Sequence, residues 1–541
     1  MVAVRTRRLE SRPAIYEGSL RSTSAGTDKQ DGRGPIVHEP HCFKTDGSCD
    51  CQGVQPQPQP EDTPALDDED PGAWAQPGVT NGNGPVAGYP AVQAVDAAAA
   101  SYLRTDVGNG QLFAALQNGR LRFIWDEQTW LEWRDGRWRR DVSGSAVRAA
   151  KAVARELLAE ATKIDDDDAR KKAVAWALQS ETRGRIIAML AMASSELNIV
   201  VTGTELDRDP YLLACGNGTL DLRKGKLRDP DPADLITLGT DVDYKPRAPR
   251  APRGRWDKFI HEVFDGDSEL IAFVKRAYGS CCTGDTRDRS LFIQYGSRFN
   301  GKSTLNRAVQ DVLGDFAHTA PLRVVMRSKQ SEIPNEVAAL ARKRLVLVAE
   351  TADGHSLDEN RVKMLTGRDK VTARFLHHEW FEFLPEYKLF LFTNFKPKID
   401  GSDGAIWDRV RLIPFNVSFA DREDADLGAK LALEAEGILA WLVEGCLEWQ
   451  KNGLGTCDAV DAATREYRAE NDLLGRFVAE RCEFDREHRV ERKTLRAAML
   501  EHFEDEGEEP PTTSMLGRAL GERGAWLQKR VYRGVRLLEV T

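Results

Sequence analysis

The stretch Gly296-Ser297-Arg298-Phe299-Asn300-Gly301-Lys302-Ser303-Thr304 decides how this sequence is interpreted. It follows the largely apolar run 291–295 and precedes a helical pattern of apolar residues between positions 305 and 313. Glycines let a loop wrap a triphosphate with its N–H groups pointing inward, and the helix that follows turns its positive end toward the anion. The order strand, loop and helix therefore predicts a phosphate-binding P-loop rather than a chance glycine turn.

Two residues at the end of this loop have distinct expected roles. Lys302 is expected to reach the β- and γ-phosphates of ATP, and the Ser303 hydroxyl is expected to ligate a magnesium ion. The sequence thus predicts ATP and Mg²⁺ as cofactors. The predicted ATP-binding residues are Gly296, Ser297, Arg298, Phe299, Asn300, Gly301, Lys302, Ser303 and Thr304.

Two buried strands are predicted after the P-loop, and each ends in a polar side chain. Residues 344–350 end at Glu350, which is expected to be the Walker B acid that orients magnesium and polarises water. Residues 388–394 end at Asn394, whose amide can contact the γ-phosphate and the attacking water as a sensor. The alternative role for Asn394 is a cap on the turn toward Pro397.

A pair of arginines follows in residues 406–415. Arg409 and Arg411 are two positions apart, so on a strand they would share one face. An arginine finger stabilises charge on a phosphoryl group that is bound elsewhere, often by a neighbouring subunit. Both arginines are therefore candidate catalytic residues. The alternative is a surface ion pair, which a lone arginine would favour.

The phosphate loop, the two strands that follow it, the segment between those strands and the arginine segment appear in a fixed order. Together they resemble the phage and plasmid primase-helicases of helicase superfamily 3, the group shared with poxvirus replicative helicases. The resemblance extends upstream through Asp106-Val107-Gly108-Asn109 and residues 217–222, and covers roughly residues 100–541. It implies an AAA+-like ATPase that assembles as a ring, usually a hexamer, and moves along single-stranded DNA at a replication fork. The segments that carry it read GSRFNGKST, RLVLVAE, LTGRDKVTAR, KLFLFTN and IWDRVRLIPF.

The sequence departs from the family pattern at two positions. Many superfamily 3 enzymes have two adjacent acids at Walker B, whereas here Thr351 follows Glu350, so Glu350 acts alone or with Asp353. Many relatives also have two adjacent arginines after the tryptophan. Here Asp408 takes the first place, which makes Arg409 the better finger candidate and Arg411 the second.

Two segments are expected to bind DNA. The family places a DNA-contacting hairpin between Walker B and the sensor, and Lys370, Arg374, His377 and His378 would grip phosphates there without reading sequence. The alternative is a structural hairpin with a solvated tip. The C-terminal segment fits a winged helix with a helix capped by residues 512–514, and its alternative is a protein-binding winged helix. Its predicted DNA-binding residues are Arg518, Lys529, Arg530 and Arg533.

The fold class follows from these elements: an α/β protein with an AAA+-like P-loop ATPase domain at 255–450. A mixed α+β helicase-associated domain at 96–245 precedes it, joined by a basic linker at 246–254. Residues 451–541 are expected to form a helical segment and the winged-helix domain. Residues 1–95 are rich in Pro, Gln and Gly with little apolar periodicity, and predict a disordered tail.

Composition narrows the class of protein. The net charge of −9 argues against a uniformly basic nucleic-acid coat, and nine scattered cysteines fit a reducing compartment. The apolar stretch 186–193 is far shorter than a membrane span, so we expect a protein of the cytoplasm that contacts no membrane. His38, His41, Cys42, Cys49 and Cys51 are zinc-competent residues in an irregular spacing, which favours a solvated tail over a metal site.

The function predicted from the sequence is an ATP-dependent replicative DNA helicase of a phage or mobile element. Its expected partners are single-stranded and forked DNA, further copies of itself in a homohexameric ring, and a separate primase or polymerase. One alternative is an origin-binding initiator whose ATPase only drives assembly. Another is the helicase subunit of a primase-helicase whose primase lies on another chain, since the tail is too short for a polymerase-type fold.

Overall fold

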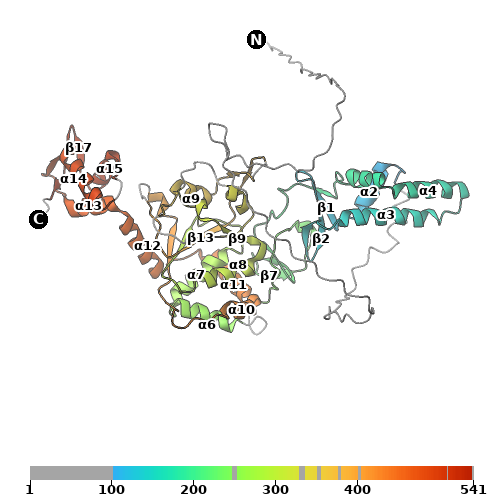
Figure 1. Cartoon of the computed structure of the whole chain (residues 1–541), viewed down its shortest axis with the longest axis horizontal. Coiled ribbons are helices and arrows are strands. Elements are labelled where there is room, and N and C mark those ends of the chain that lie inside the picture. Colours follow the sequence, from blue (N-terminus) through green and yellow to red (C-terminus); the bar gives the residue numbers. More distant parts are fainter. Residues whose placement is uncertain are drawn as a thin grey trace, which may run out of the picture. The chain divides into compact units, whose positions relative to one another are not determined.

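The computed structural model describes residues 102–246, 253–327, 335–349, 355–375, 379–399, 404–507 and 510–538, and Figure 1 labels their helices and strands. The predicted tail and its His/Cys cluster lie outside these ranges, as do Glu350, Asp353, His377 and His378. Within the described ranges, no helix is both long enough and apolar enough to cross a membrane.

The first described unit combines four helices with a small sheet. The sheet has the order β3-β2-β1-β4, and α3 runs beside α4 (Figure 1). Residues 134–137 form the hairpin turn between β2 and β3, because Trp133 pairs with Trp138 and both Asp135 and Gly136 have positive φ. The elements are α2 (Asp106–Leu116), β1 (Leu121–Ile124), β2 (Thr129–Arg134), β3 (Arg137–Arg140), α3 (Ser145–Ala161), α4 (Asp167–Ser180), α5 (Arg183–Ala193) and β4 (Val200–Val201).

Residues 167–193 form two helices with a bend between them. The chain leaves α4 at Glu181 and begins α5 after Thr182, whose backbone is extended. Two shorter helices let Met189 and Ala193 reach the core that Leu112 and Phe113 form. The bend between α4 and α5 thus allows α5 to pack against α2 and α3.

A second sheet joins the core of the ATPase region rather than that of the first unit. Leu213, Leu220 and Tyr244 belong to the same buried cluster as Trp256 and Phe292. The predicted division at residues 245 and 246–254 therefore does not separate two cores. The elements of this part are β5 (Leu212–Cys215), β6 (Gly218–Asp221), β7 (Lys226–Arg228), η1 (Pro232–Asp234) and α6 (Gly254–Val263).

A five-stranded parallel sheet in the order β14-β8-β13-β10-β9 forms the centre. Its inner strands are largely apolar because both faces are buried: Phe292 and Phe390 lie in one core, and Ile293 and Leu391 in the other. Helices α7, α8 and α11 cover the first face (Figure 1). The strands are β8 (Leu291–Tyr295), β9 (Ala317–Ala320), β10 (Leu345–Ala349), β13 (Lys388–Thr393) and β14 (Val410–Pro414).

Short elements connect these strands. A separate antiparallel hairpin pairs β11 with β12 between β10 and β13. The remaining elements of this region are α7 (Ser268–Ser280), α8 (Lys302–Leu313), η2 (Gly314–Phe316), η3 (Leu322–Val324), η4 (Asn335–Leu340), α9 (Glu359–Leu365), β11 (Val371–Ala373), β12 (Phe381–Phe383), η5 (Gly404–Ile406), α10 (Leu427–Ala432), α11 (Ala435–Asn452) and α12 (Asp458–Asn471).

Helix α12 packs on the parallel sheet, although the predicted boundary assigns it to the C-terminal segment. The Leu412 N–H donates to the Thr464 hydroxyl at 3.0 Å, and the Tyr467 ring lies edge-on against Trp407 at 5.2 Å. The boundary at 450/451 was therefore placed too early. We place the end of the ATPase region at Asn471, because α12 shares the buried core of the sheet.

The C-terminal unit has a core of its own, around Phe477, Leu495, Leu516 and Tyr532. Its strands form a three-stranded sheet in the order β16-β18-β17 and a short β15-β19 pair. The elements are α13 (Leu473–Arg481), β15 (Cys482–Glu483), β16 (Arg489–Glu491), α14 (Arg492–Asp505), α15 (Thr513–Glu522), β17 (Trp526–Gln528), β18 (Val531–Arg533) and β19 (Arg536–Leu537).

Candidate nucleotide-binding site

The predicted phosphate loop connects β8 to α8, as its sequence context requires. Both glycines are needed for space. A Cβ on Gly296 would lie 2.2 Å from the Phe415 carbonyl oxygen, and one on Gly301 would lie 2.7 Å from Val263 Cγ2. Gly301 also has φ 85°, in the left-handed region that favours glycine. The loop is thus wedged between the end of β14 and helix α6.

A buried polar network fixes the strand and the helix on either side of this loop. The Asn306 amide on α8 donates to Gln294 Oε1 on β8 at 2.6 Å, and the Tyr278 hydroxyl on α7 donates to Asn306 Oδ1 at 2.6 Å. Satisfied buried networks of this kind specify one geometry, because leaving any member unpaired is costly. This network therefore fixes the position of the α8 N-terminus relative to β8, the two elements that the loop connects.

Lys302 is the first residue of α8, and its side chain folds back over the loop. Its ammonium donates to Gly296 O at 2.7 Å, Ser297 O at 3.0 Å, Asn300 Oδ1 at 3.1 Å and Asn394 Oδ1 at 3.2 Å. Lys302 is only 5% exposed, and this burial lowers the pKa of its ammonium to about 8. A buried cation held by neutral oxygens alone is poised for an anionic partner.

Asn394 reaches Lys302 because their strands are neighbours. β13 pairs in parallel with β8, and Thr393 lies opposite Tyr295, so both chains leave the sheet at the same edge. The turn after β13 is closed by Thr393, whose hydroxyl accepts from the Phe395 N–H at 2.9 Å. The contact of Asn394 with Lys302 thus favours the sensor role over the alternative of a turn cap.

The magnesium ligands are less completely described. Ser303 lies exposed in the first turn of α8, next to Lys302. β10 lies beside β13 and ends at Ala349, which is opposite Phe392. Glu350 follows directly but lies outside the described residues, so its Walker B role stays a prediction, as does the contribution of Asp353.

The two candidate finger arginines lie at the other edge of the sheet. The Leu291 N–H donates to the Arg409 carbonyl at 2.8 Å, which places Arg409 at the start of β8, about 16 Å along the strand from Gly296. Arg409 precedes β14 and Arg411 lies within it, so they do not share a strand face as predicted. Neither can reach the phosphate loop of its own chain.

The immediate surroundings of the two arginines differ. Arg409 is half-buried, and its Nη1 donates to Ala405 O at 2.9 Å, whereas its buried Nε has no hydrogen-bond partner among the described residues. Arg411 donates to the Asp408 and Val410 carbonyls at 3.0 and 2.9 Å. Within the described part of the chain, neither arginine forms an ion pair with a carboxylate.

The candidate DNA-binding residues fall on two separate elements. Lys370 pairs with Glu382 at 3.2 Å and the Arg374 guanidinium lies over the Trp380 ring at 4.7 Å, both on the β11–β12 hairpin. His377 and His378 lie outside the described residues. In the C-terminal unit, Arg518 is exposed on α15, Lys529 and Arg530 form the turn between β17 and β18, and Arg533 is half-buried.

The sequence motif at residues 106–109 has a structural role that its spacing did not reveal. A Cβ on Gly108 would lie 1.8 Å from the Leu103 carbonyl oxygen, so only glycine fits there. The buried Asn109 amide donates to the Ser180 hydroxyl at 2.9 Å and accepts from Trp176 Nε1 at 3.3 Å. The motif therefore fastens α2 to α4, beside a cavity of about 400 Å³.

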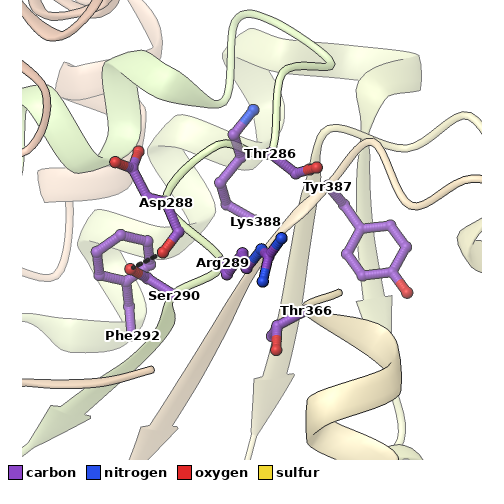
Figure 2. Close-up of a pocket in the computed structure, with 8 residues that line it drawn as sticks. All are labelled: Thr286, Asp288, Arg289, Ser290, Phe292, Thr366, Tyr387 and Lys388. Carbon is purple, nitrogen blue, oxygen red and sulfur yellow. Dashed lines mark hydrogen bonds between the residues drawn. The ribbon is translucent and has the colours of Figure 1, made fainter. Parts of the chain in front are cut away.

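A second hollow lies at the amino-terminal edge of the parallel sheet, away from the phosphate loop. Figure 2 shows its lining residues, which come from the segment before β8, the end of α9 and the start of β13. Its volume of about 10 Å³ suits one water molecule and not a nucleotide. Asp288 lines it, and burial raises the pKa of that carboxyl while Trp449 Nε1 donates to it at 2.5 Å.

Two of the predicted loop residues make contacts that the sequence did not reveal. The Asn300 side chain donates to Phe415 O at 3.2 Å and accepts from Lys302, so it ties the loop to β14. Phe299 adopts φ 58°, a conformation that costs a bulky residue energy, and its carbonyl accepts from the Phe419 N–H at 2.7 Å. The presence of an aromatic residue between the two glycines of the loop is the sequence feature that could have indicated this strain.

Comparison with known proteins relates part of this chain to a known family. Residues 110–265 match the family described as "D5 N terminal like". An Acanthamoeba polyphaga mimivirus protein named "Putative helicase" is 26% identical over 389 residues, which are 65% of this chain and 40% of that protein. An African swine fever virus protein named "Putative primase" is 25% identical over 302 residues, covering 51% and 31%. Residues 110–265 of this chain are thus similar to the D5 N-terminal-like family, and longer stretches are similar to viral proteins named as helicases and primases.

The region that matches the family crosses the predicted linker, in agreement with the core that β5, β6 and α6 share. A Frog virus 3 protein named "Putative helicase" is 24% identical, over 51% of this chain and 37% of its own length. The chain spans well under half of each of these viral relatives. Among solved structures, the apo C-terminal region of NrS-1 aligns with a TM-score of 0.41 and 13% identity, covering 78% of this chain and 96% of that one.

Proposed function

We propose that this chain is an ATP-dependent replicative DNA helicase that works as a ring on single-stranded DNA. The observation that carries the proposal is the contact of Lys302 Nζ with Asn394 Oδ1, at 3.2 Å, where β8 and β13 end and α8 begins. Ligands of α/β sheets bind beyond the carboxyl ends of the strands, and a helix N-terminus there favours an anion. The names of the viral relatives support the same class of function.

The residues of the site divide the work of ATP hydrolysis. Lys302 exchanges its loop carbonyls for phosphate oxygens and offsets the charge that shifts in the transition state. Asn394 is then free to orient the attacking water. Ser303 and Glu350 would hold a magnesium ion, which would supply positive charge that offsets the charge of the phosphates.

A ring explains why the arginines stand apart from the phosphate loop. An arginine at the opposite sheet edge can contribute only to a nucleotide held by another subunit, and a ring brings such edges together. The β11–β12 hairpin then contacts the translocating strand. The C-terminal unit, with helices α13 to α15 and the β17–β18 hairpin, serves as a winged helix on duplex DNA through Arg518, Lys529, Arg530 and Arg533.

The proposal is tested with a forked duplex that carries no origin sequence. Purified protein with ATP and Mg²⁺ is expected to displace one strand, and the fraction displaced is read from a labelled oligonucleotide. ATP hydrolysis without displacement would favour the initiator alternative instead. De novo synthesis of primers by this chain would instead indicate a primase activity, which the name of one viral relative suggests.

Replacement of Glu350 by glutamine is expected to preserve ATP binding and to reduce hydrolysis sharply. The loop and Lys302 hold the phosphates, whereas the orienting charge for magnesium and water is lost. Binding is measured with a fluorescent ATP analogue and hydrolysis by phosphate release. Asp353→Asn is the matched variant: a normal rate for Glu350→Gln together with a slow Asp353→Asn would assign the acid to Asp353.

ATP affinity is expected to fall as the pH rises through about 8, the pKa to which burial lowers the Lys302 ammonium. Below this pH Lys302 is charged and attracts phosphate, and above it the neutral amine predominates. The Kd of a non-hydrolysable ATP analogue should therefore rise about tenfold between pH 7 and pH 9. The Lys302→Arg variant keeps its charge over this range, so its Kd should stay flat. A flat profile for the wild type as well would rule out titration of Lys302.

The same shift has a consequence for stability. The ammonium in the unfolded chain keeps the ordinary pKa of 10.5, above that of the folded state. Folding therefore releases a proton between about pH 8 and 10.5, and burial of this charge opposes folding most strongly below pH 8. ATP phosphates would relieve this cost, so the ligand stabilises the fold more below pH 8 than above it.

A further inference from the structure

Two residues of the phosphate loop adopt the left-handed backbone conformation, Gly301 with φ 85° and Phe299 with φ 58°. Glycine adopts this conformation without cost, whereas a bulky side chain is strained in it. Burial of the ring in the core would offset the strain, but Phe299 is 56% exposed. A strained residue that stays largely in solvent points to a function for its side chain, and in this loop the function concerns the bound nucleotide.

The backbone on either side of the Phe299 ring is fixed. The Phe299 carbonyl accepts from the Phe419 N–H at 2.7 Å, and the neighbouring Asn300 side chain donates to Phe415 O at 3.2 Å. Gly301 packs closely against helix α6. Only the two side-chain torsions of Phe299 therefore remain to be ordered when a flat ligand covers its ring, and the entropic cost of that contact is small.

Strand order places Phe299 on one side of the loop and the hydrolytic residues on the other. The loop follows β8, which lies between β13 and β14 in the sheet. Asn394, proposed to orient the attacking water at the γ-phosphate, follows β13 and contacts Lys302 at 3.2 Å. Phe299 is instead bonded to the segment that follows β14. A triphosphate that lies along the loop with its γ-phosphate toward β13 extends its nucleoside toward β14, where Phe299 lies.

The segment after β14 suits a nucleoside better than a phosphate. The Arg422 guanidinium lies over the Phe419 ring at 4.9 Å, which places a second aromatic group and a flat cation on this side of the loop. Asp421 and Glu423 flank Arg422, and both are exposed. Their charge disfavours phosphate but has little effect on an uncharged base. Aromatic faces are the groups on which bases stack without regard to sequence.

We propose that the Phe299 ring stacks on the base of the bound nucleotide. This inference rests on the proposed function, since it requires that ATP binds at the phosphate loop. It goes beyond it by assigning a side chain of the loop to the base, whereas the loop was expected to hold phosphates through its N–H groups. Purines present a larger flat surface than pyrimidines, so the same contact favours ATP and GTP over CTP and UTP.

The test compares ATP with ribose 5′-triphosphate, which has the same sugar and phosphates but no base. Each ligand displaces a ribose-labelled, non-hydrolysable fluorescent ATP analogue from the full-length protein in the presence of Mg²⁺. The Kd of the analogue is measured first for every variant. The wild type is expected to bind ATP about tenfold more tightly than ribose 5′-triphosphate, within the range known for stacking of one base on an aromatic side chain.

Variants assign that preference to the ring. Phe299→Ala is expected to weaken ATP binding about tenfold and to leave ribose 5′-triphosphate binding unchanged. Phe299→Tyr keeps a ring and should retain the preference. Phe299→Gly removes the ring and the strain together, so its Tm should stay close to that of the wild type while the preference is lost. Trp125→Ala is the matched control, because Trp125 is 50% exposed but lies in the first unit, between β1 and β2. It should bind both ligands as the wild type does.

The outcomes separate this inference from the function on which it rests. Equal wild-type affinity for both ligands, or a preference for ATP that Phe299→Ala retains, would overturn the stacking and leave a phosphate-binding ATPase standing. Loss of both ligands in equal proportion would also overturn it, since Phe299 would then act through the shape of the loop. If Phe299→Ala changed only the assembly of subunits, its ring would contact a neighbouring copy instead. Absence of binding of either ligand by the wild type would refute the proposed function itself.

Discussion

The Lys302→Ala variant is expected to lose ATP hydrolysis and DNA unwinding while it keeps its fold. The ammonium is the one charge that touches both the loop carbonyls and Asn394, so its removal takes away the cation that would follow the phosphates into the transition state. Loss of a single preorganised donor at such a site costs about 10²–10³-fold in turnover, and a charged donor costs at least as much. Phosphate release at saturating ATP measures the effect.

The fold should survive because α8 is held by apolar packing and by the Asn306–Gln294 bond, neither of which involves Lys302. Thermal unfolding is therefore expected to remain cooperative. Arg307→Ala is the control variant, since this arginine lies on the same helix with its side chain 84% exposed. It should hydrolyse ATP at the wild-type rate. Near-normal turnover by folded Lys302→Ala protein would refute the P-loop assignment.

Much of the central sheet could be predicted because its inner strands are buried on both faces. Such strands are largely apolar, as residues 291–295, 345–349 and 388–393 are, and they stand out from the helices around them. Their parallel pairing then brings their carboxyl ends to one edge. For this reason the meeting of Lys302 and Asn394 could be anticipated from strand order, without knowledge of any distance.

The errors arose where contacts distant in sequence decide the structure. The sequence of residues 211–244 does not indicate that they pack in the core around Trp256. The sequence of α12 likewise does not indicate that the Thr464 hydroxyl accepts a hydrogen bond from the backbone of β14. The spacing of apolar residues predicts helical structure but does not predict the bend between α4 and α5.

The Arg409→Ala variant is expected to be nearly inactive although its own phosphate loop is intact. Its place at the start of β14, at the sheet edge opposite Gly296, allows it to act only on ATP held by a neighbouring subunit. A finger of this kind contributes about 10³–10⁵ in turnover. The unpartnered buried Nε of Arg409 fits a side chain whose final partner comes from outside the described chain. Arg411→Ala, whose side chain is directed to its own backbone carbonyls, should lose less activity.

Mixing two inactive proteins tests the shared site directly. A ring that contains both Lys302→Ala and Arg409→Ala subunits has some interfaces where an intact loop faces an intact arginine, and those interfaces should hydrolyse ATP. The recovered rate should rise and fall with the mixing ratio, with its maximum near equal amounts, whereas either variant alone stays inactive at any concentration. Subunit exchange is verified in parallel by energy transfer between labelled copies. If subunits exchange and no activity returns, Arg409 does not act across the interface, and either Arg411 or a site within one subunit supplies the missing charge.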